Sequence, residues 1–155
     1  MGDRPSSRNR HRTVRYIDSK KAADYITLNE GYRKEMYYDS EDIATIGIGF
    51  NLEEGFTLEE SKMILRHRMG KFINELCARV PVYIDVCQTR KIVLLDMAYN
   101  LGVSRLLGFK KMLAAIEIGD YQLAAKEMLD STYARQVKGR ARRNALMMET
   151  GEWYE

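Results

Sequence analysis

The segment that most constrains the fold is the run from Ile92 to Ala98, which is apolar at every position except Asp96. A helix that is apolar around nearly its whole circumference must be surrounded by other elements. The run is far shorter than the roughly eighteen apolar residues of a membrane span, and Gly102 is placed to end it. The chain therefore needs further helices packed around this segment.

Amphipathic helices are expected on both sides of the run. Thr57 and Glu60 form a capping box, and the apolar spacing that follows predicts a long helix over about 58–78, ended by Pro81. Three shorter helices are expected over about 109–118, 120–129 and 136–148.

The sequence before residue 57 has a different pattern. Residues 20–30 predict a short helix ended by Gly31. Residues 32–38 and 43–50 have the composition of two strands, and the polar residues 39–42 that of a turn. Gly47 and Gly49 lie inside the second expected strand, where they indicate the close approach of another group. The prediction is an α+β fold: a small β-hairpin lobe joined by a long helix to a larger helical lobe.

Charge separates the beginning of the chain from the rest. The 155 residues are 45% hydrophobic, which is enough for one core. The net charge is only +3, yet residues 1–21 carry seven Lys or Arg against two Asp. We therefore expect a flexible basic arm over residues 1–20, able to contact an anionic surface, and one folded domain over residues 21–155 that acts as a monomer.

Several kinds of chemistry find no support in the sequence. The two histidines, His11 and His67, have no neighbouring metal ligand, so no metal is expected, and no glycine-rich phosphate loop precedes a helix. Cys77 and Cys87 could pair, but their pattern is more typical of buried packing residues.

A second cluster of positive charge lies near the C-terminus. Five basic residues occur within positions 135–143 without an acidic one. Such a run is usually a solvated helix face and less often a phosphate-binding strip. It lacks interleaved aromatic residues, so no nucleic-acid partner is expected.

Two carboxyl groups are the best candidates for chemistry. Glu30 ends the first helix, where the helix dipole favours the protonated form that a general acid needs. Asp39 starts a polar turn, where an ionised base is favoured, and Thr45 across the hairpin could hold a water molecule. A glycosidase uses such a pair of carboxyl groups beside an open groove, although two acids at this spacing are more often surface charges.

These residues resemble a known family. Glu30-Gly31, Asp39 and the run from Thr45 to Gly49 are similar, in identity and spacing, to the phage-type lysozymes of glycoside hydrolase family 24. The resemblance covers roughly residues 22–154. It continues through segments that match later parts of the family pattern: 97–102, 108–109, 124–125, 140–143 and 150–153.

The resemblance implies an inverting glycosidase without a cofactor. Glu30 would be the general acid at the β-1,4 link between N-acetylmuramic acid and N-acetylglucosamine of peptidoglycan, and Asp39 and Thr45 would position the attacking water. Inversion asks for carboxyl groups about 6.5–9.5 Å apart. The resemblance further implies that Arg140 pairs with Glu30 across the cleft and that Tyr99, Asn100 and Gly49 contact the sugar, although Tyr99 could equally be a core residue.

Two departures from the family pattern stand out. Phe50 replaces the usual histidine after the second glycine, and only six residues separate Phe50 from Thr57, so a further strand must be short or absent.

We expect an endolysin, made in the host cytoplasm without a signal peptide and released across the inner membrane to act on the wall. A wall-remodelling or virion-borne glycosidase is a variant of that hypothesis. A different hypothesis is a lysozyme fold that binds peptidoglycan or the envelope without turnover.

Overall fold

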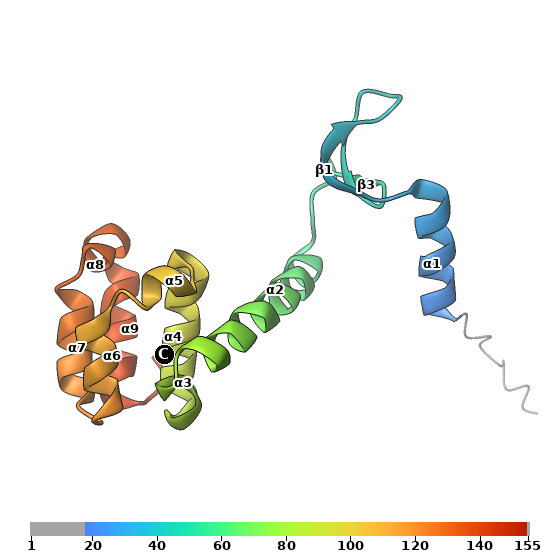
Figure 1. Ribbon diagram of the computed structural model, residues 1–155. Helices are drawn as coiled ribbons and strands as arrows, with labels where there is room; N and C mark the ends of the chain where they lie inside the picture. The colour runs from blue at the N-terminus through green and yellow to red at the C-terminus, as the bar shows by residue number, and fades with distance from the viewer. Residues whose placement is uncertain (1–17, 155) are drawn as a thin grey trace, which may run out of the picture. The chain divides into compact units, whose positions relative to one another are not determined.

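The computed structural model describes residues 18–154, which form two compact units divided after Thr57 (Figure 1). Most of the expected basic arm, residues 1–17, lies outside the described residues.

The first unit begins with helix α1 (Ser19–Glu30). The carboxylate of Asp18 accepts a hydrogen bond from the Lys21 amide at 3.1 Å and so caps the helix N-terminus. The helix thus starts inside the last residues of the expected arm. Gly31, at a φ of +73°, donates its N–H to the Thr27 carbonyl at 2.9 Å and ends the helix at Glu30, as the sequence predicted.

A three-stranded antiparallel sheet follows, in the order β1 (Arg33–Tyr38), β2 (Ala44–Gly47) and β3 (Phe50–Asn51). Tyr37 pairs with Thr45, and Thr45 in turn pairs with Asn51. The prediction of one continuous strand over 43–50 was wrong. Gly47 and Gly49 have φ values of +69° and +70°, and this left-handed backbone folds the chain into a tight turn before Phe50. The third strand is only two residues long, as its short sequence required.

The second unit is entirely helical among its described residues. It comprises α2 (Leu58–Arg79), α3 (Val82–Asp85), α4 (Gln88–Leu101), α5 (Val103–Leu106), α6 (Lys110–Glu117), α7 (Tyr121–Leu129), α8 (Thr132–Val137) and α9 (Gly139–Thr150). The α+β class, the long helix and the apolar central helix α4 agree with the prediction. The single helix expected over 136–148 is instead two, because Lys138 adopts a φ of +35° and breaks the chain direction between α8 and α9.

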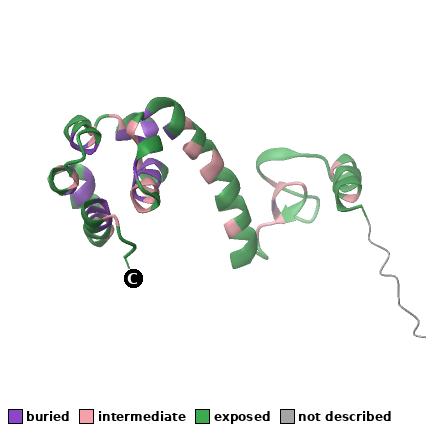
Figure 2. Cartoon of the chain, turned by 90° about the horizontal axis from the view of Figure 1, so that it is seen from below, coloured by how far each residue is buried: buried purple, intermediate pink, exposed green. Residues whose placement is uncertain are grey.

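The hydrophobic core lies in the second unit. Among residues 18–154, every buried hydrophobic residue belongs to the stretch from Leu76 to Met148, and α4 contributes five of them (Figure 2). In α2 only Leu76, near its C-terminal end, is buried. Helices α7 and α9 pack along each other.

Cys77 and Cys87 are both exposed free thiols. The expectation that they are buried packing residues was therefore wrong. Within residues 18–154, no helix combines the length and apolar character that a membrane span requires.

Candidate active site

Glu30 lies against the turn between β2 and β3. A Cβ atom placed on Gly49 would come within 3.1 Å of the Glu30 Oε2 atom. Two features favour glycine at position 49: its φ of +70° disfavours any side chain, and a Cβ there would require the Glu30 carboxyl group to move by a few tenths of an ångström. The close approach that the strand glycines indicated is, at Gly49, the approach of the expected general acid.

Phe50 fills the space at the other glycine of this turn. Its ring would lie 3.0 Å from a Cβ on Gly47, and it makes an edge-on contact with Phe56 at 6.2 Å between centroids. The residue that departs from the family pattern thus packs beside the turn that faces Glu30.

Asp39 is fixed at the start of the turn between β1 and β2. Its Oδ1 atom accepts hydrogen bonds from the backbone amides of Glu41 at 2.8 Å and Ile43 at 2.9 Å. This local pattern is an Asx-type turn, which explains why an aspartate suits the position. Oδ2 accepts no hydrogen bond from the described residues, so one oxygen orients the carboxyl group and the other stays open to a ligand or water.

Thr45 is the buried position of the sheet, with 4% of its surface exposed. Its hydroxyl donates to the Ile43 carbonyl at 3.0 Å. A hydroxyl that donates its only hydrogen keeps its lone pairs as acceptors for a further donor such as water.

The backbone N–H and C=O of Ile43 connect Asp39 and Thr45. The N–H donates to the Asp39 carboxylate, while the C=O accepts from the Thr45 hydroxyl at 3.0 Å and from the Asp39 amide at 3.1 Å. These bonds fix the two side chains relative to each other through one backbone unit. Sequence reasoning missed Ile43 because its contribution comes from the backbone, which every residue except proline can supply.

In the second unit, Arg140 is held by Asp96. The Arg140 Nε atom donates to Asp96 Oδ2 at 2.8 Å, and a second guanidinium nitrogen donates to Oδ1, which makes a bidentate ion pair. This hydrogen bond, against a smaller opposing effect of burial, raises the pKa of Arg140 above its usual value. The expected contact of Arg140 with Glu30 would join the two units and stays a prediction.

Two more side chains complete the Arg140 network. The Asn144 amide donates to Asp96 Oδ2 at 2.7 Å and to the Tyr133 hydroxyl at 3.3 Å. Burial, followed by the charge of Asp96, raises the pKa of Tyr133, so the phenol stays neutral as a partner. Asp96 is 44 residues away from Arg140 in the chain, and no local spacing could have revealed the pair.

Tyr99 and Asn100 are exposed residues at the C-terminal end of α4. The Tyr99 ring makes an edge-on contact with Phe72 of α2 at 5.7 Å and remains 44% exposed. Tyr99 is therefore a surface residue that packs against α2, and not a core residue. Contact of Tyr99 and Asn100 with sugar stays a prediction.

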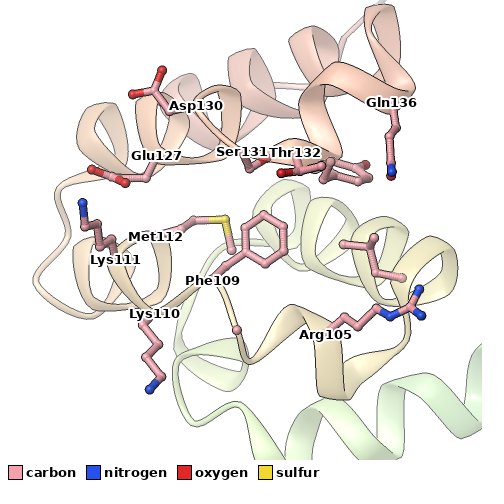
Figure 3. A pocket seen from close by; sticks show the side chains of 13 residues that line it. Arg105, Phe109, Lys110, Lys111, Met112, Glu127, Asp130, Ser131, Thr132 and Gln136 are labelled. Atoms are coloured by element: carbon pink, nitrogen blue, oxygen red, sulfur yellow. The ribbon is translucent and has the colours of Figure 1, made fainter.

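A cavity of about 640 Å³ opens in the second unit beside Tyr133 (Figure 3). Phe109 and Met112 form an apolar part of its wall, and both signs of charge border it through lysines 110 and 111 and the acids Glu127 and Asp130. Neither Tyr99 nor Asn100 lines it.

Among the described residues, no three His, Cys, Asp or Glu side chains gather closely enough to hold a metal ion.

The α+β fold agrees with the fold expected for the family that the sequence resembles. Comparison with known families narrows the identity: the phage lysozyme family matches residues 27–146, and the chain belongs to that family. Membership implies peptidoglycan as the class of substrate.

Relatives of known description agree with this assignment. Over 83% of its length the chain is 29% identical to "Probable T4-type lysozyme 1" and 27% identical to "Probable T4-type lysozyme 2" of Dictyostelium discoideum, and it covers 93% of each. It is also 27% identical to the pre-baseplate central spike protein Gp5 of Enterobacteria phage T4, but it spans only 28% of that protein's length.

Proposed function

We propose that this protein is an endolysin-type muramidase that cleaves the β-1,4 bond between N-acetylmuramic acid and N-acetylglucosamine with inversion. Glu30 acts as the general acid, and Asp39 and Thr45 position the attacking water. The proposal rests on family membership and on the arrangement of these three residues in the first unit.

The reaction balances with these groups alone. The Glu30 carboxyl group gives its proton to the glycosidic oxygen as the bond from that oxygen to the anomeric carbon breaks. Water attacks the same carbon from the opposite face, and the Asp39 carboxylate accepts the proton that the water loses. The products are a new reducing end, a free hydroxyl on the leaving sugar, an ionised Glu30 and a protonated Asp39, and proton exchange with solvent restores both.

The observation that carries the proposal is the set of hydrogen bonds made by the backbone N–H and C=O of Ile43. It orients Asp39 through one carboxylate oxygen at 2.9 Å and holds the Thr45 hydroxyl at 3.0 Å, which leaves acceptor positions on both side chains. A water molecule needs such acceptors to be held in one orientation for attack. Arg140 supports the site in this proposal, and Asp96 sets the direction of its guanidinium group.

Turbidity loss of purified peptidoglycan, with the released muropeptides identified, tests the activity. Glu30→Gln keeps the size of the side chain but cannot deliver the proton, so lysis should fall to background. Glu35→Gln, at an exposed position of β1, is the matched control and should keep full activity. A Glu30→Gln protein that still lyses would refute the mechanism. A wild-type protein that binds peptidoglycan without releasing fragments would be a binding module.

Two finer points need their own measurements. Proton NMR of the first-formed anomer distinguishes inversion from retention, and a product with retained configuration contradicts the role given to Asp39. For the endolysin role, cells that make the protein in their cytoplasm should lyse only after the inner membrane is permeabilised. Lysis without permeabilisation would show that the protein reaches the wall without help.

A further inference from the structure

The basic cluster near the C-terminus separates into two parts in the structure. Arg140 is neutralised by Asp96. The other four cations, Arg135, Lys138, Arg142 and Arg143, make no ion pair with any carboxylate of residues 18–154. Three of these four cations line one depression.

Arg135, Lys138 and Arg142 line a shallow groove of about 600 Å³. Arg135 comes from α8, Arg142 from α9, and Lys138 from the break between the two helices. Leu129 and Ala134 supply the rest of the wall, and no acidic side chain lines it. The unusual backbone of Lys138, with a φ of +35°, makes the change of direction that brings the two helix ends together.

Three cations of like sign at one groove repel one another and attract an anion. Arginine offers a planar fork that matches two phosphate oxygens, and lysine adds a point charge. The start of α9 is at the same place, and the positive end of a helix dipole adds to the field there. A phosphate group satisfies all of these features.

We propose that Arg135, Lys138 and Arg142 form a phosphate-binding site that holds a phosphodiester polymer of the bacterial envelope, separate from the residues that carry out hydrolysis. The choice of an envelope polymer rests on the proposed function, while the site itself rests on the groove alone. The site anchors the enzyme on phosphate-bearing material near its substrate.

Two alternative ligand classes fit the groove less well. An anionic membrane surface would also meet the neighbouring groove between α7 and α9, whose border carries Asp120, Asp130 and Glu149, and these acids would oppose it. Nucleic acid gains affinity from bases that stack on aromatic rings, and no aromatic side chain lines the cationic groove.

The test compares two variants of the full chain that lose equal charge. The site variant is Arg135→Gln/Lys138→Gln/Arg142→Gln. The control is Arg66→Gln/Arg68→Gln/Lys71→Gln, which removes three exposed cations of α2 that form no described ion pair. Both sets of side chains are exposed, so both variants should keep the parent's circular dichroism spectrum and melting temperature.

Binding is measured with fluorescent poly(glycerol phosphate) by anisotropy over a range of salt concentrations. We expect the site variant to lose roughly tenfold or more in affinity and its salt dependence to weaken by about two to three phosphate contacts. The control should stay within about threefold of the parent, since it loses only long-range attraction. Equal losses in both variants, or no binding by the parent, would overturn the proposal.

Further arms identify the source of the phosphate. Inorganic phosphate should compete only weakly. If it competed with an affinity equal to that of the polymer, the ligand of the site would be a small phosphate compound and not a polymer. Stronger binding to vesicles of anionic phospholipid or to duplex DNA, lost in the site variant, would overturn the choice of a wall polymer.

Catalysis provides the separation from the proposed function. The site variant should hydrolyse peptidoglycan stripped of phosphate polymers at the parent rate, and Glu30→Gln should bind poly(glycerol phosphate) normally. Failure of lysis with intact polymer binding would refute the proposed function alone.

Discussion

At the scale of single residues, Gly49 shows how backbone and side-chain demands meet at one position. Its φ of +70° is one that side-chain-bearing residues rarely adopt, and its missing Cβ leaves room for the Glu30 carboxyl group. Gly55 also has a φ of +70°, but nothing lies within 4 Å of where its Cβ would be. The two glycines therefore separate backbone strain from contact with Glu30.

We predict that Gly49→Ala abolishes most lysis while Gly55→Ala does not. Each substitution should cost about 1–2 kcal/mol of unfolding free energy through the left-handed backbone. Only the alanine at position 49 displaces the Glu30 carboxyl group, and a small displacement of a catalytic group can cost about a hundredfold in rate. Urea unfolding and turbidity assays on both variants check this. Equal activity in the two would show that Glu30 has no need of Gly49.

Asp39 allows a prediction that separates its structural role from its chemical one. In Asp39→Asn the side-chain oxygen can still accept from the Glu41 and Ile43 amides, so the turn should keep its stability to within about 0.5 kcal/mol in urea unfolding. The amide cannot take a proton from water, so activity in the turbidity assay should fall at least about a hundredfold.

Asp42→Asn is the control for Asp39→Asn, because it removes the same charge from the same turn. Asp42 has a φ of +62°, a conformation that asparagine tolerates well. Activity should stay near that of the parent. A similar loss in both variants would mean that the turn's charge matters and that Asp39 has no specific role.

These residue-scale details were only partly accessible from the sequence. Glu30, Asp39 and Thr45 could be singled out because their types and spacing resemble a known family. The hydrogen bonds of the Ile43 backbone and the burial of Thr45 depend on three-dimensional packing, which residue types and their spacing do not show. The partner of Arg140 depends on the packing of α4 against α9, which no local pattern encodes.

At the scale of elements, the sequence predicted helices best where propensity, capping and burial agreed. The central helix α4 has an apolar surface and a terminal Gly102, and α2 begins directly after Thr57 as expected. The break between α8 and α9 escaped prediction because the residue there is Lys138, and lysine gives no signal of a positive φ. The turn at Gly47 and Gly49 was also missed, because glycine is compatible with several conformations and does not single out a turn.

The joint between α4 and α9 gives the third prediction, for Asp96→Asn. With its amide oxygen in the position of Oδ2, the asparagine can still accept from Arg140 Nε and from Asn144, but its NH₂ group then faces the second Arg140 nitrogen. One hydrogen bond is therefore lost, and the guanidinium is left partly uncompensated. Because both side chains are about a third exposed, solvent reduces the cost to roughly 1–2 kcal/mol. Urea unfolding measures it.

A double-mutant cycle with Arg140→Gln shows whether the loss comes from the pair. The double variant should be less destabilised than the sum of the single variants. Asp130→Asn, an exposed acid without an ion pair among the described residues, should change the stability by less than about 0.5 kcal/mol. Additive single effects would mean that Asp96 and Arg140 contribute independently.

At the scale of the whole molecule, the two units differ in what stabilises them. In the part of the chain that the structure describes, the second unit contains every buried hydrophobic residue, whereas Thr45 is the only buried residue of the first. Burial of apolar surface is the dominant favourable term in folding. The sequence predicted both lobes. It did not predict that the buried hydrophobic residues lie in the second unit, because the apolar residues within positions 22–56 suggested that the first unit also packs a core of its own.

This inequality leads to the last prediction, that residues 58–155 fold alone. The fragment keeps the whole buried core and the bidentate pair of Arg140 with Asp96, so it should show a helical spectrum and a cooperative thermal transition. Residues 18–57 as a peptide should show neither, because three short strands and one helix without a buried apolar face cannot offset the entropy of ordering them. In the fragment, Asp96→Asn should lower stability by the same amount as in the full chain, since all its partners are present. A fragment that melts without cooperativity would show that the first unit supplies part of the core's stability.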